Sequence, residues 1–117
     1  MGFKQGSHTV YTLDVHIATR YVCILIKSFR DKRTAAIFEG LAARGVGPDL
    51  LKRARMRLAL LDAAATLAYL RSPPGNRLES LRGDRAGQYS IRVNDQWRIC
   101  FLWRDGVAYD VEFCDYH

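Results

Sequence analysis

The chain has 117 residues, a length typical of a single domain whose core is stable without disulfides or metal. Hydrophobic residues make up 49% and charged residues 26%, which excludes a wholly disordered chain, and no apolar run approaches the ~20 residues of a membrane-spanning helix. The formal net charge of +6 favours an anionic partner, such as nucleic acid, a membrane surface or an acidic protein, although many small proteins are mildly basic without one.

The cysteines Cys23, Cys100 and Cys114 form neither a CxxC motif nor a Cys/His pair at zinc spacing. The N-terminus carries no continuous apolar segment of signal-peptide length. Together these features indicate a reducing cytoplasm and no structural disulfide. A bridge between the strands that carry Cys100 and Cys114 stays open as an alternative.

Residues 1–21 show no clear hydrophobic period, and we interpret them as an N-terminal extension. Residues 22–29 are apolar and β-branched, which predicts a first strand.

Two amphipathic helices are predicted next. Asp31 can cap a helix that runs to about Arg44, with an apolar face formed by Ile37, Phe38, Leu41 and Ala42. A second helix is expected from Pro48 to Leu70, with a buried stripe formed by Leu51, Ala54, Leu58, Leu61 and Ala65. A short Gly-rich turn joins the two helices, so we expect an αα-hairpin.

Three strands are predicted after a Pro-rich break at residues 72–76, because apolar residues alternate with polar ones over 89–93, 97–103 and 107–113. Asp105-Gly106 is a strong signal for a two-residue hairpin turn. Such clean alternation predicts that one face of the sheet packs on the helices, with both tryptophans in the core. The expected fold class is therefore α+β.

The hairpin register relates Arg98 to the end of the chain. If the turn has two residues, Arg98 lies opposite Phe113, on the same sheet face as Asp115 and His117. A guanidinium, a carboxylate and an imidazole would then converge. A bulge or a longer loop would reverse this parity.

Such a cluster can cleave RNA by transesterification, which needs a base for the ribose 2′-OH, positive charge for the transition state and an acid for the leaving oxygen. The candidate groups are an imidazole, a phenol, a carboxylate and three guanidiniums: His117, Tyr116, Asp115, Arg98, Arg82 and Arg85. The sequence has no two-metal carboxylate cluster and no P-loop, so neither metal nor cofactor is expected.

Each assignment has a purely structural alternative. His117 can be a frayed terminal residue, Arg98 a solvated strand arginine, and Arg82 and Arg85 loop charges without a fixed partner. A basic helix face is more often solvated than part of a nucleic-acid groove; here it consists of Lys52, Arg53 and Arg57.

Residues 78–99 resemble the HigB toxins of the RelE/ParE superfamily of toxin–antitoxin systems. The elements that carry the resemblance are Gly83-Asp84-Arg85-Ala86-Gly87-Gln88, Asn94-Asp95-Gln96-Trp97-Arg98-Ile99 and the closing Asp115-Tyr116-His117. The resemblance implies a RelE-like toxin domain at residues 25–117, with an αα-hairpin packed on a small, mostly antiparallel sheet, after an extension at residues 1–24.

The resemblance also implies an activity: ribosome-dependent cleavage of messenger RNA in the ribosomal A site, without metal, inhibited by a HigA-type antitoxin. The implied catalytic residues are Asp115, Tyr116, His117 and Arg98, and the expected RNA-binding residues are Arg82, Arg85, Lys52, Arg53 and Arg57. Some members have a catalytic histidine where this chain has Glu79. Glu79 could act as the base, or the site could rely on the C-terminal residues alone.

The resemblance begins near Leu25, which occupies the place of the initiator methionine in relatives. We hypothesise that translation starts there from a non-AUG codon. The intact mass of the protein expressed from its own locus tests this, since a mass that includes residues 1–24 would contradict it.

Two other functions stay open. One is a ParE-like poison of DNA gyrase, which shares the fold but needs no terminal acid-Tyr-His cluster. The other is a non-catalytic RNA- or protein-binding paralogue, which Glu79 keeps in consideration. Substitution of His117 by alanine separates them, because it abolishes activity only in the nuclease.

Overall fold

The structure is a computed structural model that describes residues 26–71 and 74–115. In this part of the chain it contains three α-helices and a four-stranded antiparallel sheet, so the predicted α+β class is confirmed. The predicted extension at residues 1–24, Leu25, Tyr116 and His117 lie outside the described residues.

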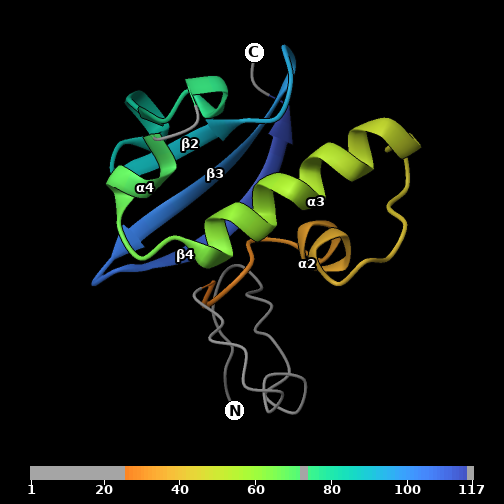
Figure 1. Cartoon of the computed structure of the whole chain (residues 1–117), viewed down its shortest axis with the longest axis horizontal. Helices are drawn as coiled ribbons and strands as arrows, with labels where there is room; N and C mark the ends of the chain where they lie inside the picture. The colour runs from red at the N-terminus through yellow and green to blue at the C-terminus, as the bar shows by residue number, and fades with distance from the viewer. Residues whose placement is uncertain (1–25, 72–73, 116–117) are drawn as a thin grey trace.

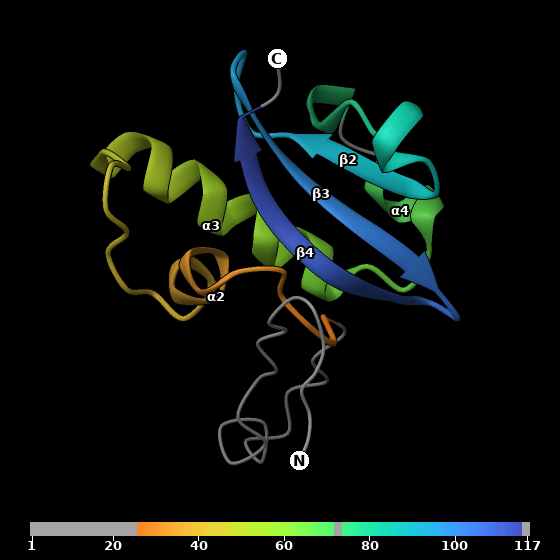
Figure 2. The ribbon, with the colours of Figure 1, turned by 180° about the vertical axis from the view of Figure 1, so that it is seen from behind.

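The helices are α2 (Lys32–Phe38), α3 (Pro48–Ala63) and α4 (Leu67–Arg71), and the strands are β1 (Glu79–Ser80), β2 (Gln88–Arg92), β3 (Trp97–Arg104) and β4 (Val107–Asp115). Two short 3-10 helices, η1 (Pro74–Asn76) and η2 (Gly83–Arg85), flank β1. The strands lie in the order β1-β2-β3-β4. The helices cover one face of the sheet, and Figure 2 shows the other face (Figures 1 and 2).

The predicted first strand is wrong in its described part, residues 26–29. These residues form two isolated parallel bridges, Ile26 with Ala108 and Phe29 with Val111. The N–H of Lys27 donates to the Ala108 carbonyl at 2.8 Å. The segment therefore covers the outer edge of β4 without becoming a full strand, which protects that edge from pairing with another chain.

Helix α2 begins as predicted but ends early. The Asp31 carboxylate accepts a hydrogen bond from the Thr34 N–H at 2.7 Å, as an N-cap does. Gly40, with a φ of 89°, ends the helix well before Arg44, because its left-handed conformation returns two N–H groups to carbonyls of the last turn. Leu41, predicted on the apolar face, is consequently 56% exposed.

The predicted second helix is divided into α3 and α4. Ala64 adopts an extended conformation with a ψ of 120°, and the Thr66 hydroxyl then caps α4 by accepting from the Tyr69 N–H at 3.2 Å. The predicted stripe is confirmed for Ala54, Leu58 and Leu61, which are fully buried, while Leu51 is half-buried and Ala65 is exposed. A threonine that can cap competes with helix continuation, which explains the break.

Strands β2, β3 and β4 lie where the alternation predicted them. Arg104 pairs with Val107 across Asp105-Gly106, and both turn residues have positive φ, at 52° and 80°, as a type I′ turn requires. Trp97 and Trp103 are partly buried against the core on the helical side.

A bulge in β4 reverses the parity on which the predicted convergence depended. The ladder shifts between Cys100 and Leu102, and Asp110 supplies the extra residue with a φ of 51°. Arg98 therefore lies opposite Cys114, not Phe113, so the predicted pairing is wrong. The Asp110 N–H donates to the Ser28 hydroxyl at 3.0 Å, which stabilises the irregular backbone.

The two faces of the sheet bury different clusters. The helical face holds the main core, to which the sheet contributes chiefly Ile91, Val93, Ile99, Phe101, Ala108, Val111 and Phe113. The opposite face holds a small cluster of Leu81, Cys100 and Cys114. None of the helices among residues 26–71 and 74–115 has both the length and the apolar character needed to cross a membrane.

Candidate active site

Arg98 is a nearly buried arginine on the face of the sheet away from the helices, 6% exposed. Its Nε donates to the Ser90 hydroxyl at 2.7 Å, and its Nη2 donates to the Arg77 carbonyl at 2.6 Å. Arg77 has a φ of 46°, a conformation that costs energy and recurs at functional sites. These contacts fix the orientation of one guanidinium.

Glu79 lies beside this arginine. Strand β1 pairs Glu79 with Ser90, so its side chain shares the face of Arg98. The Glu79 Oε1 is 3.8 Å from Arg98 Nη2, and the Glu79 side chain is 48% exposed. A fixed positive charge next to a solvent-accessible carboxylate is a pair that can stabilise an anion and accept a proton.

Arg85 is the last residue of η2 and lies over the same face, where Glu112 pairs with Cys100. Arg85 Nη1 donates to the Gln88 amide oxygen at 3.0 Å and forms an ion pair with Glu112 at 3.0 Å. Burial opposes the charge of Arg85, but Glu112 outweighs burial, and the pKa of Arg85 is raised. Arg82 precedes η2 and is exposed. Arg85 therefore has fixed partners, contrary to the alternative of an unconstrained loop charge.

Asp115 lies on the other face of the sheet, at the end of β4. It pairs with Trp97, and its Oδ2 accepts a hydrogen bond from the Gln96 side-chain amide at 3.0 Å. Because of the bulge, the predicted same-face arrangement of Arg98 and Asp115 is wrong. They remain near each other only because Arg98 pairs with Cys114, the residue before Asp115.

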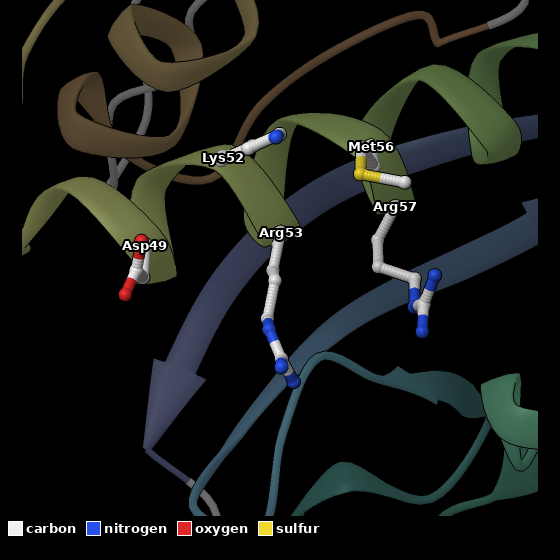
Figure 3. A pocket seen from close by; sticks show the side chains of 5 residues that line it. All are labelled: Asp49, Lys52, Arg53, Met56 and Arg57. Atoms are coloured by element: carbon white, nitrogen blue, oxygen red, sulfur yellow. The ribbon is translucent and has the colours of Figure 1, made fainter.

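Three basic residues of α3, with Asp49 and Met56, line a groove of about 500 Å³ (Figure 3). They are Lys52, Arg53 and Arg57, three of the five residues that the sequence predicted to bind RNA. Arg57 Nε donates to the Arg92 carbonyl at 2.8 Å, and burial, followed by the charges of Arg53 and Arg92, lowers the pKa of Arg57.

The predicted RNA-binding residues therefore form two groups. Lys52, Arg53 and Arg57 project from a helix that covers the apolar face of the sheet, whereas Arg85 lies over the polar face with Arg98 and the exposed Arg82 precedes η2.

Cys100 and Cys114 are both buried free thiols in the structure, and the absence of a disulfide between them stays a prediction. Their sulfur atoms lie 2.7 Å apart on the polar face, beside Arg98 and Arg85. The hydrogen bond from Cys114 lowers the pKa of Cys100, and the same hydrogen bond together with burial raises that of Cys114.

Sequence reasoning missed the groups that orient the site. Ser90 and the Arg77 carbonyl support Arg98, and Gln96 contacts Asp115. A polar residue inside an alternating strand was the available signal for Ser90. No sequence signal identifies a main-chain carbonyl such as that of Arg77. No group of three His, Cys, Asp or Glu side chains that could hold a metal ion occurs within residues 26–71 and 74–115.

Residues 27–117 match a family described as "HigB-like toxin", a "RelE-like toxin of type II toxin-antitoxin system HigB". The chain is 44% identical over 81 residues to "Toxin HigB-1" of Vibrio cholerae serotype O1, a match that covers 68% of this chain and 85% of the relative. It is 37% identical over 93 residues to "Endoribonuclease HigB" of Proteus vulgaris, covering 80% of this chain and 100% of the relative.

Proposed function

Since the chain belongs to the HigB-like family of RelE-like toxins of type II toxin–antitoxin systems, we propose that it is an endoribonuclease that cleaves messenger RNA in the ribosomal A site and so blocks translation. The observation that carries this proposal is the arrangement around Arg98. The fixed guanidinium of Arg98 lies beside Glu79. Arg98 belongs to β3, which pairs with β4 as far as Asp115.

The proposed chemistry is transesterification. A base removes the proton of the ribose 2′-OH, the 2′-oxygen bonds to phosphorus, and the bond from phosphorus to the 5′-oxygen breaks as that oxygen gains a proton. His117 and Glu79 are the proposed acid/base groups, with Tyr116 as a stacking or relay group and Asp115 orienting them. Arg98 stabilises the charge that develops on the phosphate oxygens, and no metal takes part.

The two basic groups have different proposed roles. Arg82 and Arg85 contact phosphates near the cleaved bond: Arg85 lies over the face that carries Arg98, and Arg82 is three residues earlier, at the start of η2. Lys52, Arg53 and Arg57 contact RNA of the message or of the ribosome through their groove on α3. Phosphate contacts of this kind make ribosome association weaker as salt rises.

A toxin of this class has an antitoxin partner. We propose that the partner here is of the HigA type and that the toxin acts in the cytoplasm, where ribosomes translate. Arg55 of α3 donates to the carbonyl of Ile37 in α2 and to that of Leu41 just after α2, and these contacts support an αα-hairpin as part of the proposal.

The test is a reconstituted translation reaction in which the 5′ ends of the messenger are mapped by primer extension. New ends inside codons should require ribosomes and should disappear with His117→Ala. Arg98→Lys should lower the cleavage rate at saturating ribosomes by on the order of 10²-fold, because a lysine cannot reproduce the geometry of the guanidinium.

Arg104→Lys is the matched control, since Arg104 is an exposed arginine at the far end of the same strand. It should cleave like the unmodified protein. Intact messenger under active protein synthesis would contradict the proposal and would direct attention to a gyrase supercoiling assay.

A further inference from the structure

Helix α2 contacts the last part of β4 just before the C-terminal acid-Tyr-His residues. The Phe113 N–H donates to the Thr34 hydroxyl at 2.9 Å, and Arg33 Nη2 donates to the Phe113 carbonyl at 3.0 Å. Both main-chain hydrogen-bonding groups of Phe113 are therefore taken by side chains of one helix. The segment before this helix makes main-chain hydrogen bonds with the edge of β4 at Ala108 and Val111. The side chains of Arg33 and Thr34 therefore extend the cover of this edge toward the end of the strand.

Arg33 also packs against the aromatic pair at this end of the sheet. The rings of Trp97 and Phe113 are stacked, with centroids 4.4 Å apart and an interplanar angle of 6°. The Arg33 guanidinium carbon is 5.4 Å from the Trp97 centroid and 5.3 Å from the Phe113 centroid. One side chain thus joins α2 to β3 and β4 by a hydrogen bond and by cation–π attraction.

These contacts lie next to Asp115, the last residue of β4 and the first of the proposed catalytic residues. Phe113 is two residues before Asp115, and Trp97 is the residue that pairs with Asp115. Gln96 contacts Asp115 from the β2–β3 connection. From the helical layer, Arg33 donates to the carbonyl of the peptide that joins Phe113 to Cys114, the one nearer to Asp115 of the two Phe113 groups that α2 contacts.

We propose that Arg33 is a positioning residue: it acts through Phe113 and Trp97 to fix the backbone of β4 up to Asp115, the first of the proposed catalytic residues at the chain end. This inference rests on the proposed nuclease function. The physical reason is that a displacement of about 1 Å in a catalytic group can cost on the order of 10²-fold in rate.

The test uses Arg33→Met, which keeps an apolar stem against the rings but removes the charge and the donors, and Arg33→Lys, which keeps the charge and a single flexible donor. Arg104→Met is the matched control. Arg104 lies at the opposite end of the same hairpin and also contacts a ring, that of Tyr109, at 5.5 Å. Both methionine variants lose one positive charge, so a general effect of charge on ribosome binding cancels in the comparison.

In the cleavage assay, Arg33→Met should lower the rate at saturating ribosomes by on the order of 10-fold, with an unchanged half-saturating ribosome concentration. Arg33→Lys should recover part of the loss, and Arg104→Met should resemble the unmodified protein. A changed half-saturating ribosome concentration with an unchanged rate at saturation would overturn the proposal, because a positioning residue acts on the chemical step.

A second readout does not depend on activity. The backbone amide order parameters of Cys114 and Asp115, measured by ¹⁵N relaxation, should fall from about 0.85 toward 0.6 in Arg33→Met and stay high in Arg104→Met. Unchanged values would overturn the positioning role even if cleavage is lost. If the unmodified protein does not cleave RNA, the nuclease proposal fails, and the order parameters alone decide whether Arg33 fixes the end of β4.

Discussion

The two faces of the sheet are stabilised in different ways. The helical face packs a large apolar core in which many side chains share the burial. The polar face has a small cluster of Leu81, Cys100 and Cys114 and a few directional contacts, chiefly those of Arg98 with Ser90 and the Arg77 carbonyl. We therefore expect substitutions on the helical face to change mainly stability, and those around Arg98 to change mainly the proposed activity.

The largest effect is expected on the helical face. Phe101→Ala removes a fully buried ring that lies near Tyr89 and Trp103. It should lower the free energy of unfolding by about 3–5 kcal/mol, a large part of the ~5–15 kcal/mol typical of a domain. Guanidinium denaturation followed by circular dichroism measures the change.

The control for this substitution is the next residue along the strand. Leu102 is half-buried and pairs with Gln88 and Tyr109. Leu102→Ala should cost only about 1 kcal/mol, because less apolar surface leaves water there. Equal losses at the two positions would refute the contrast between the faces.

An intermediate effect is expected at the bulge of β4, where the alternation of side chains between the two faces of the sheet is reversed. Ser28 is nearly buried, and its hydroxyl accepts from the Asp110 N–H at the bulge. Ser28→Ala leaves that N–H without this acceptor and should lower the free energy of unfolding by about 1–3 kcal/mol. The midpoint of urea denaturation should shift at an unchanged slope.

Ser80→Ala is the control for the bulge, because Ser80 is an exposed strand serine. It should change stability by less than about 0.5 kcal/mol. A Ser28→Ala variant as stable as Ser80→Ala would mean that the bulge does not depend on the hydroxyl.

The smallest effect is expected at the ion pair of the polar face. Arg85 and Glu112 are both partly exposed, with side-chain exposures of 36% and 21%. A double-mutant cycle with Arg85→Met and Glu112→Gln should give a coupling energy of about 0.5–1 kcal/mol that decreases as salt is added. A coupling above about 3 kcal/mol would show that this pair stabilises the fold as strongly as the apolar core does.

Local patterns predicted β2, β3 and β4 well and the helix ends poorly. The period-2 pattern of β3 and the Asp105-Gly106 turn depend on residues that are adjacent in sequence, and both are confirmed. Several residues in each predicted helix could end it. The prediction placed the ends near Arg44 and Leu70, whereas α2 ends before Gly40 and α3 ends before Ala64.

The composition of the site could be predicted in part, but its geometry could not. Arg98 and Glu79 are close together, as a shared site requires, and three predicted basic residues line one groove on α3. Arg98 and Asp115 lie on opposite faces of the sheet because β4 has one extra residue, at Asp110. The alternation of apolar and polar residues in the sequence gives no sign of this bulge.

The sequence by itself determined the α+β class, the hairpin turn and the family, because these depend on local periodicity and on linear motifs. Only the tertiary structure decided which face each residue of β4 occupies, because Ser28, more than 80 positions away, supplies the hydrogen bond that stabilises the bulge. It also decided that Arg33 contacts the end of β4, because the chain must fold before a helix near its beginning can meet the last strand.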